Sequence, residues 1–266
     1  MKIKLLITLS ILLSITSYAK PKLLVTGSST IAPLMLEISK RYENKFKDIR
    51  IDIQTGGSSR GIADQRKQTS NIGMVSRALK PQETDLKSYL VARDGISLIT
   101  HKSNPIKELT RKQIIEIYLG KTTNWSKVGG PNKTITVVHK AEGRSTLEVF
   151  LKYFNLKNSN VKPHIIIGDN EQGIKTVSGN PYAIGYVSIG TAEYNAKIGV
   201  PIKTLSLNGV KATVKNVSLG IYPLSRELNL IIKGKPDSNS KKLIQFALSN
   251  EVKDLVQQHY FVPINQ

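Results

Sequence analysis

Short β-like runs alternate with amphipathic helical segments along most of this chain. The apolar residues of segment 31–46 recur at spacings of three and four, as in a helix with one buried face, whereas segment 49–54 alternates as a strand does. Further strands are expected at 22–26, 71–76, 96–101, 135–139, 165–167, 183–187 and 228–232, and further helices at 61–68, 111–119, 146–154, 241–248 and 252–260. Because strand–helix–strand repetition implies parallel strands joined by helical crossovers, the sequence predicts an α/β fold.

The start of the chain has the composition of an export signal. Two lysines precede an apolar run over residues 5–15, and residues 17–19 (SYA) end in the small-x-small pattern that a signal peptidase accepts. The run is too short to cross a hydrocarbon core of about 30 Å as a helix. We therefore expect a signal peptide at 1–19, cleaved after about Ala19, with an N-terminal membrane anchor as the alternative. The chain has no cysteine, so it lacks the thiol of a bacterial lipid anchor, and a periplasmic location is expected.

Three segments share one design, in which a strand ends, a turn rich in Gly, Ser and Thr follows, and a helix begins. They are 26–30 (TGSST), 56–61 (GGSSRG) and 142–146 (EGRST). The first N–H groups of a helix lack partners and its dipole is positive there, so an anion is favoured at such a junction. Hydroxyl groups add donors, and glycine lets the backbone approach a ligand closely. One such serine is usually only a helix N-cap, but three turns of this kind indicate an anion site.

Arginines near these turns strengthen the interpretation. Arg60, Arg77 and Arg144 can each donate charge-assisted, bidentate hydrogen bonds to a tetrahedral oxyanion. The chain carries 39 Lys and Arg against 19 Asp and Glu, a formal net charge of +20, and this positive field would attract a small anion. The lysines are spread along the chain and aromatic residues make up only 6%, so a nucleic-acid partner is not expected.

A second interpretation of the middle turn is catalytic. Residues 57–61 (GSSRG) fit G-x-S-x-G between a strand and a helix, which is the setting of a hydrolase nucleophile. A secreted hydrolase would use Ser59, with Asp169 or Asp237 and with His259 downstream. The four histidines lack the spacing of metal ligands, so neither a metal site nor another cofactor is expected.

Six motifs, in this order, carry a family resemblance. They are TGSSTIAPLM at 26–35, TGGSSRGI at 55–62, NIGMVSRALK at 71–80, IYLGKTTNW at 117–125, KAEGRSTLEVF at 140–150 and AIGYVSIG at 183–190. Together they make the chain, from about Lys22 to its C-terminus, resemble the periplasmic phosphate-binding proteins of ABC-type phosphate importers. An extracellular adhesion or matrix protein that reuses this fold is a further alternative.

The resemblance implies a type II periplasmic binding protein with two lobes, each a mixed, mostly parallel sheet flanked by helices. It implies lobe 1 at 20–96 plus 227–266 and lobe 2 at 97–226, joined by a two-strand hinge. The lobes would close on one inorganic phosphate and dock on the membrane permease of an ABC importer. Such a protein is a monomer, binds its ligand without catalysis and needs no cofactor.

The resemblance also implies which residues bind phosphate. Carried over by position, they are Ser29, Thr30, Ile31 through its N–H, Ser58, Ser59, Ser76, Arg77, Arg144, Ser145 and Thr146. Two positions depart from the family pattern. Ser76 stands where many members have an aspartate that accepts the proton of hydrogen phosphate, and either Ser76 or Glu142 could accept it here. Lys140 stands where many have an arginine, and Arg144 could supply the guanidinium from a new position.

Overall fold

The computed structural model describes residues 20–264 of the chain. The expected signal peptide at 1–19 lies outside the described residues. Within them, no helix combines the length and the apolar character needed to cross a membrane.

The first lobe is built on three parallel strands with β1 in the centre. Val25 in β1 lies opposite Ile53 in β2 and Ile72 in β3, so the apolar residues of the three strands share a face. The strands are β1 (Lys22–Gly27), β2 (Arg50–Thr55) and β3 (Ile72–Val75), and the helices are α1 (Ala32–Lys45), α2 (Ser58–Lys67), α8 (Ser238–Leu248) and α9 (Lys253–Gln258), with η3 (Asn250–Val252) and β12 (Val262–Pro263) near the end. Because α1 and α2 each follow a strand directly, both begin at the same end of the sheet.

The second lobe repeats this arrangement with β6 between β7 and β8, again in parallel. Its strands are β6 (Thr136–Lys140), β7 (Ile165–Ile167) and β8 (Ala183–Ser188), with the short β5 (Glu108–Leu109), β9 (Ile202–Thr204) and β10 (Ser206–Leu207). Its helices are α3 (Arg111–Tyr118), α4 (Ser145–Phe154), α5 (Asn170–Ser178), α6 (Ile189–Lys197) and α7 (Val214–Ser218), with η1 (Trp125–Val128) and η2 (Asn158–Asn160). Helices α4 and α5 each begin within a few residues of a strand end, as α1 and α2 do.

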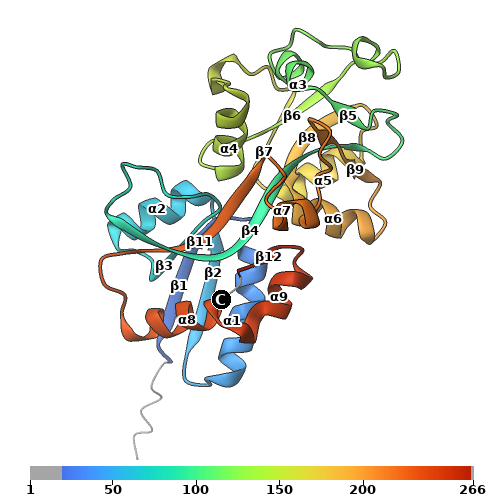
Figure 1. Cartoon of the computed structure of the whole chain (residues 1–266). Helices are drawn as coiled ribbons and strands as arrows, with labels where there is room; N and C mark the ends of the chain where they lie inside the picture. Colours follow the sequence, from blue (N-terminus) through green and yellow to red (C-terminus); the bar gives the residue numbers. More distant parts are fainter. Residues whose placement is uncertain (1–19, 265–266) are drawn as a thin grey trace, which may run out of the picture.

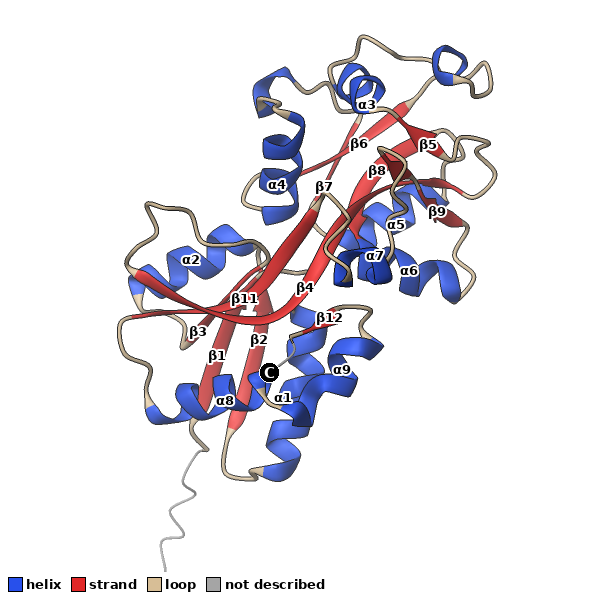
Figure 2. Cartoon of the chain, in the orientation of Figure 1, coloured by secondary structure: helices blue, strands red, loops and turns tan. Residues whose placement is uncertain are grey.

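Two long antiparallel strands, β4 (Leu86–His101) and β11 (Ser225–Lys233), run from one lobe to the other (Figure 1). Strand β11 lies between β3 and β4 and is antiparallel to both. Beyond Gly95, β4 pairs instead with β8 of the second lobe. The strand order is therefore β2-β1-β3-β11-β4-β8-β6-β7, and helices cover the sheet in each lobe (Figure 2).

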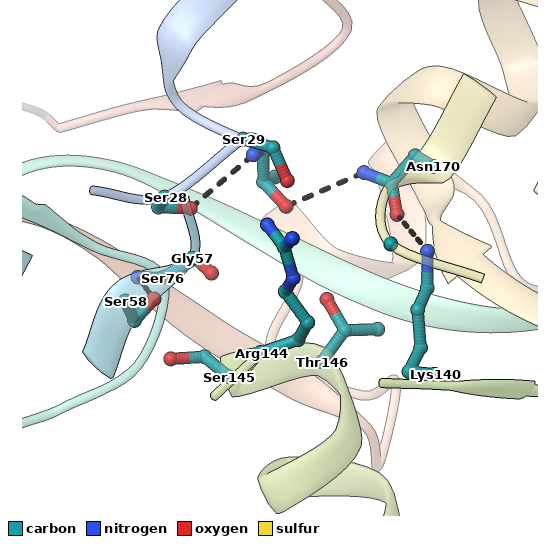
Figure 3. Close-up of a pocket in the computed structure, with 12 residues that line it drawn as sticks. Ser28, Ser29, Gly57, Ser58, Ser76, Lys140, Arg144, Ser145, Thr146 and Asn170 are labelled. Carbon is teal, nitrogen blue, oxygen red and sulfur yellow. Dashed lines mark hydrogen bonds between the residues drawn. The ribbon is translucent and has the colours of Figure 1, made fainter. Parts of the chain in front are cut away.

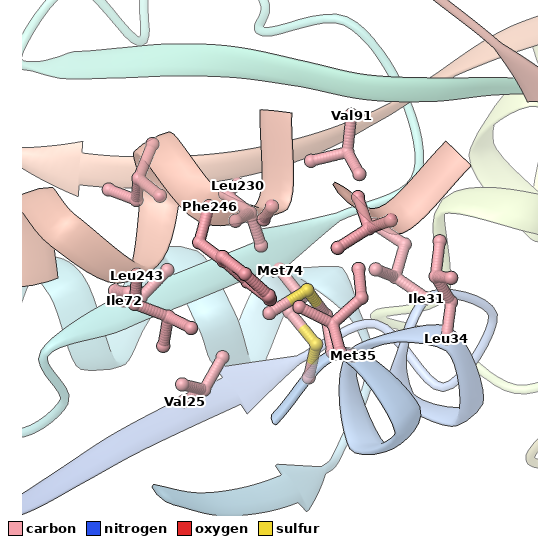
Figure 4. Packing of buried hydrophobic residues seen from close by; sticks show 14 of the residues in the cluster. Val25, Ile31, Leu34, Met35, Ile72, Met74, Val91, Leu230, Leu243 and Phe246 are labelled. Atoms are coloured by element: carbon pink, nitrogen blue, oxygen red, sulfur yellow. The ribbon is translucent and has the colours of Figure 1, made fainter. Parts of the chain in front are cut away.

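Each lobe has its own large hydrophobic core. The first packs Met35 of α1 and Phe246 of α8 against strand residues that include Ile72 and Leu230 (Figure 4). In the second, the Phe150 ring of α4 stacks on the Tyr186 ring of β8 with centroids 3.9 Å apart. These contacts fix α1 and α4 on their sheets, and with them the turns that precede both helices.

The expected α/β class and two-lobed fold are confirmed, whereas several element boundaries differ. Strand β4 begins at Leu86, ten residues before the expected start at 96. Its first part was not predicted, because polar residues such as Lys87 and Asp94 interrupt the apolar pattern there. Helix α2 begins at Ser58, three residues before the expected start, so two serines of that turn lie in its first turn. Helices α5 (Asn170–Ser178) and α6 (Ile189–Lys197) were not expected.

Candidate anion-binding site

A small pocket lies between the two lobes, where four helices begin. Helices α1 and α2 approach it from the first lobe, and α4 and α5 approach it from the second (Figure 3). Its lining residues are Ser28, Ser29, Thr30, Gly57, Ser58, Ser76, Lys140, Arg144, Ser145, Thr146, Gly168 and Asn170. Four helix N-termini with their unpaired N–H groups and positive dipole ends thus meet around one space, which favours an anion.

The first turn is held in place by hydrogen bonds of Ser28. Its N–H donates to the Met74 carbonyl (2.9 Å), and its Oγ accepts from the Thr30 N–H (3.2 Å). Gly27 before it has φ +132°, and a Cβ there would lie 2.3 Å from the Met74 oxygen, so only glycine fits. These contacts direct Ser29 and Thr30 toward the pocket.

The second turn, which belongs to the first lobe, contacts the backbone of the second lobe beside the pocket. Gly57, with φ +93°, precedes α2, and a Cβ on it would lie 2.6 Å from the Gly143 carbonyl oxygen of the second lobe. The buried Ser58 Oγ accepts from the Ser76 N–H (3.2 Å), so these two residues are fixed together. The Ser59 N–H donates to that same Gly143 carbonyl (3.1 Å), which is a direct backbone contact between the lobes.

The third turn supplies a guanidinium and two hydroxyls. Arg144 is the N-cap residue of α4, and its side chain extends from that helix toward the turn of Ser28 and Ser29 (Figure 3). The Ser145 side chain is buried, and its Oγ has no hydrogen-bond partner within the described protein. A buried hydroxyl without a partner costs free energy, so Ser145 is poised to bond a ligand in the pocket.

Lys140, the last residue of β6, brings a second cation into the pocket. It is only 3% exposed, and its Nζ donates to the Asp169 carbonyl (2.5 Å) and to Asn170 Oδ1 (3.2 Å). Burial is the main cause that lowers the pKa of Lys140 to about 7, and the nearby Arg226 and Arg144 lower it further, against the opposing effect of Asp169. An anion in the pocket would favour the charged ammonium and raise this pKa again.

A buried ion pair between Arg226 and Asp94 lies next to the first and third turns and connects them by hydrogen bonds. Arg226 of β11 donates to Asp94 Oδ2 from Nε (3.0 Å) and Nη2 (2.7 Å), and both side chains are 1% exposed. The same guanidinium donates to Thr146 Oγ1 (2.8 Å) and to Thr30 Oγ1 (3.4 Å). Asn170 adds a bond from Nδ2 to Thr30 Oγ1 (3.3 Å). The Thr30 hydroxyl of the first lobe is therefore fixed by residues from β11 and the second lobe.

Most of the residues expected from the sequence line the pocket. They are Ser29, Thr30, Ser58, Ser76, Arg144, Ser145 and Thr146. Three others, Ile31, Ser59 and Arg77, lie outside its lining. Ile31 is the N-cap of α1 and packs in the first core, and Ser59 is exposed and contacts the second lobe through its backbone.

Two arginines that were expected to bind a ligand are engaged elsewhere. Arg77 donates two hydrogen bonds of 2.8 Å to Glu83 and forms an ion pair of 3.1 Å with Glu148. Arg60 turns away from the pocket and donates to Gln54 Oε1 (2.8 Å) and to the carbonyl of Thr55 (2.7 Å). Both expectations are corrected for the same reason. Partners from neighbouring segments engage the two guanidiniums, Glu83 and Glu148 for Arg77 and Gln54 and Thr55 for Arg60, and hold them outside the pocket lining.

Five residues that line the pocket were not among the expected ligands: Ser28 and Gly57, which lie in two of the predicted turns, and Lys140, Gly168 and Asn170. Segment 168–170 (GDN) was not predicted as an anion-binding turn, because it has neither Ser nor Thr. The residue pattern that could have identified this turn is that of a helix N-terminus. A glycine follows strand β7, and the Asp169 side chain caps α5 by accepting from the Gln172 N–H (2.8 Å).

The lining offers cations, hydroxyls and amides, and none of its members is a carboxylate. Glu142, considered as a proton acceptor, is exposed and accepts instead from Asn158 Nδ2 (3.0 Å). The hydrolase residues are not assembled either. Asp169 caps α5 and Asp237 caps α8, and within residues 20–264 no side-chain hydrogen bond joins His259 to Ser59 or to either aspartate. Within residues 20–264, no cluster of side chains suited to a metal ion is found. The pocket is therefore equipped to hold an oxyanion by donation alone.

Comparison with known proteins gives one consistent picture. The model of the PBP superfamily domain matches residues 15–251. The chain is 26% identical over 251 residues to the phosphate-binding protein PstS of Bacillus subtilis strain 168, across 92% of this chain and 82% of that protein.

Two solved structures extend the comparison to the fold. A Clostridium perfringens protein assigned as a phosphate ABC transporter substrate-binding protein, with bound phosphate, is 34% identical with a TM-score of 0.84, over 92% of this chain and 100% of that one. An ABC-type phosphate transport receptor from Vibrio cholerae is 26% identical with a TM-score of 0.76, over 91% and 100%. The likeness thus spans both lobes.

Proposed function

This chain belongs to the PBP superfamily, and we propose that it captures inorganic phosphate and delivers it to an ABC importer. One observation carries the proposal: the N-termini of four helices, two cations and the buried Ser145 hydroxyl, which has no hydrogen-bond partner in the described part of the chain, converge on one pocket between the lobes. The relatives named for phosphate binding and the related structure with bound phosphate support the choice of anion. The role is binding and release, without catalysis.

In this proposal the anion is held by residues of both lobes. Ser29 and Thr30 with Ser58 and Ser76 act from the first lobe, and Arg144, Ser145 and Thr146 act from the second, together with Lys140 and Asn170. A buried site of this kind binds through charge-assisted hydrogen bonds, which are stronger than neutral ones. Because the contacts come from two lobes, they form together only when the lobes close.

We propose that lobe 1 comprises 20–96 plus 227–266 and lobe 2 comprises 97–226. The division is supported by the two cores. The first draws on side chains from Leu23 to Ala92 and from Leu228 to Phe261, and the second on side chains from Leu98 to Leu224 together with Ile96 at the boundary itself. The hinge would lie where β4 leaves β11 for β8, at Gly95. Opening and closing there would admit and enclose the ligand.

We further propose that the mature protein begins after about Ala19, works in the periplasm as a monomer and docks on the membrane permease of the importer. Support comes from the charge pattern of the first residues and from relatives named as parts of ABC transport systems. No nucleic-acid partner or cofactor is part of the proposal.

Isothermal titration of the mature protein with phosphate tests the function. We expect a dissociation constant of about 1 μM or below, which corresponds to roughly 8 kcal/mol. Arg144→Ala should weaken binding strongly, whereas the matched variant Arg60→Ala, from a similar turn but outside the pocket, should bind as the wild type does. No binding heat with phosphate, arsenate or sulfate would overturn the proposal.

A further inference from the structure

An ion-pair cluster connects the lobes beside the pocket without lining it. Glu148, in the first turn of α4, belongs to the second lobe, whereas Arg77 and Lys80 follow β3 in the first. Glu148 Oε2 lies 3.1 Å from Arg77 Nε and 2.6 Å from Lys80 Nζ. Two cations of one lobe thus meet one carboxylate oxygen of the other.

The first-lobe side of this cluster is fixed independently of Glu148. The Arg77 guanidinium donates to both carboxylate oxygens of Glu83 (2.8 Å each) and to the Ala78 carbonyl (2.9 Å). The Arg77 carbonyl in turn accepts from Asn229 Nδ2 of β11 (3.0 Å). Arg77 therefore keeps its position and its charge balance through Glu83, whether or not the second lobe is near.

Glu148 has a different set of partners. Within the described residues, its carboxylate makes ion pairs with Arg77 and Lys80 only, and both belong to the opposite lobe. Its side chain is 25% exposed, so water is partly removed from these pairs when the lobes are together. Opening of the lobes would separate Glu148 from both cations, and no bound anion is needed for them to meet again.

We propose that Glu148 is a positioning residue that stabilises the closed form of the protein and thereby sets its anion affinity without contacting the anion. The inference rests on the proposed function for its effect on affinity, whereas its effect on lobe closure stands on the ion pairs alone. A ligand that binds only the closed form has an apparent affinity reduced by the fraction of molecules that are open. Removing the charge of Glu148 should therefore weaken binding by raising that fraction.

The test compares Glu148→Gln, which keeps size and removes charge, with Glu116→Gln. Glu116 pairs with Lys112 at 3.8 Å inside the second lobe, so its loss leaves lobe contacts unchanged. Since the chain has no cysteine, Lys47→Cys and Lys127→Cys place one exposed dye on each lobe for energy-transfer measurements. Phosphate affinity and dissociation rate are measured on the same proteins.

For Glu148→Gln we expect the ligand-free protein to shift toward the open form. Phosphate should bind about five- to thirtyfold more weakly through faster dissociation, which is in the range of typical coupling free energies between two sites. With saturating phosphate, the energy transfer should match that of the wild type. Unchanged energy transfer in the ligand-free variant, or an equal loss of affinity in Glu116→Gln, would overturn the inference. Because the ligand-free comparison does not need phosphate, a failure of the proposed function and a failure of this inference give different results.

Discussion

The pKa of Lys140 near 7 predicts that phosphate affinity depends on pH through a protein group. The ammonium is present below pH 7 and is lost as the pH rises through 7, because burial disfavours the charge. If binding requires the cation, the free protein must take up a proton before or during binding. Lys140→Arg removes this requirement, since a guanidinium stays charged throughout.

The magnitude follows from the titration. At pH 7 about half of the free molecules carry the cation, and at pH 8 about one in ten, so each further pH unit costs about 1.4 kcal/mol. The ratio of wild-type to Lys140→Arg affinity should therefore be constant below about pH 6 and fall about tenfold per unit above about pH 7. The titration of phosphate itself cancels, because both proteins bind the same ligand.

Isothermal titration at pH 6, 7, 8 and 9 measures this ratio. In buffers of different ionisation enthalpy at pH 7, wild-type binding should take up about half a proton more than the Lys140→Arg variant does. Lys112→Arg is the matched control, because the Lys112 side chain is 84% exposed and far more solvated. A ratio that stays constant within twofold from pH 6 to pH 9 would refute the reasoning.

Three other substitutions separate binding from stability. Ser145→Ala removes a hydroxyl that has no hydrogen-bond partner among residues 20–264, so phosphate affinity should fall about fivefold while the free energy of unfolding in urea changes by less than about 0.5 kcal/mol. An unchanged affinity would contradict this. Gly57→Ala should abolish tight phosphate binding without unfolding the lobes, because the added Cβ would lie 2.6 Å from the Gly143 oxygen and oppose lobe closure. Small-angle scattering that shows normal closure of this variant with phosphate would contradict the prediction. Asp94→Asn leaves buried Arg226 without its counter-charge and should destabilise the protein by about 3–5 kcal/mol, and a wild-type urea midpoint would show that this pair is dispensable.

The strand–turn–helix segments of the pocket were predictable because their chemistry is local. Glycine at position 57 and hydroxyl residues such as Ser58 and Ser145 belong together in short turns, and the helices behind them have clear apolar periodicity. Sequence alone therefore identified the junctions and the α/β class. It did not identify the start of β4, whose polar residues face the partner lobe or solvent.

Long-range pairing explains what the sequence could not predict. Arg77 was expected to bind a ligand, but its partners include Glu148, which lies 71 positions further along the chain and comes close only through lobe contact. Lys140 resembles the many exposed lysines of this basic chain, and only the tertiary structure buries it beside Asn170. Charge and hydrogen-bond capacity can be read from residue types, whereas their saturation depends on neighbours brought together by folding.

The place of β11 in the sheet has a consequence for the order of folding. This strand lies between β3 and β4 and supplies Leu228, Leu230 and Ile232 to the first core, although the chain makes it after the whole second lobe. During N-to-C synthesis, the second core can assemble from contiguous chain, whereas the first sheet cannot be completed until the strand between β3 and β4 has been made. The N-terminal lobe should therefore be the later one to become resistant to protease, and a chain truncated before Ser225 should retain a compact second lobe beside an unfinished first one.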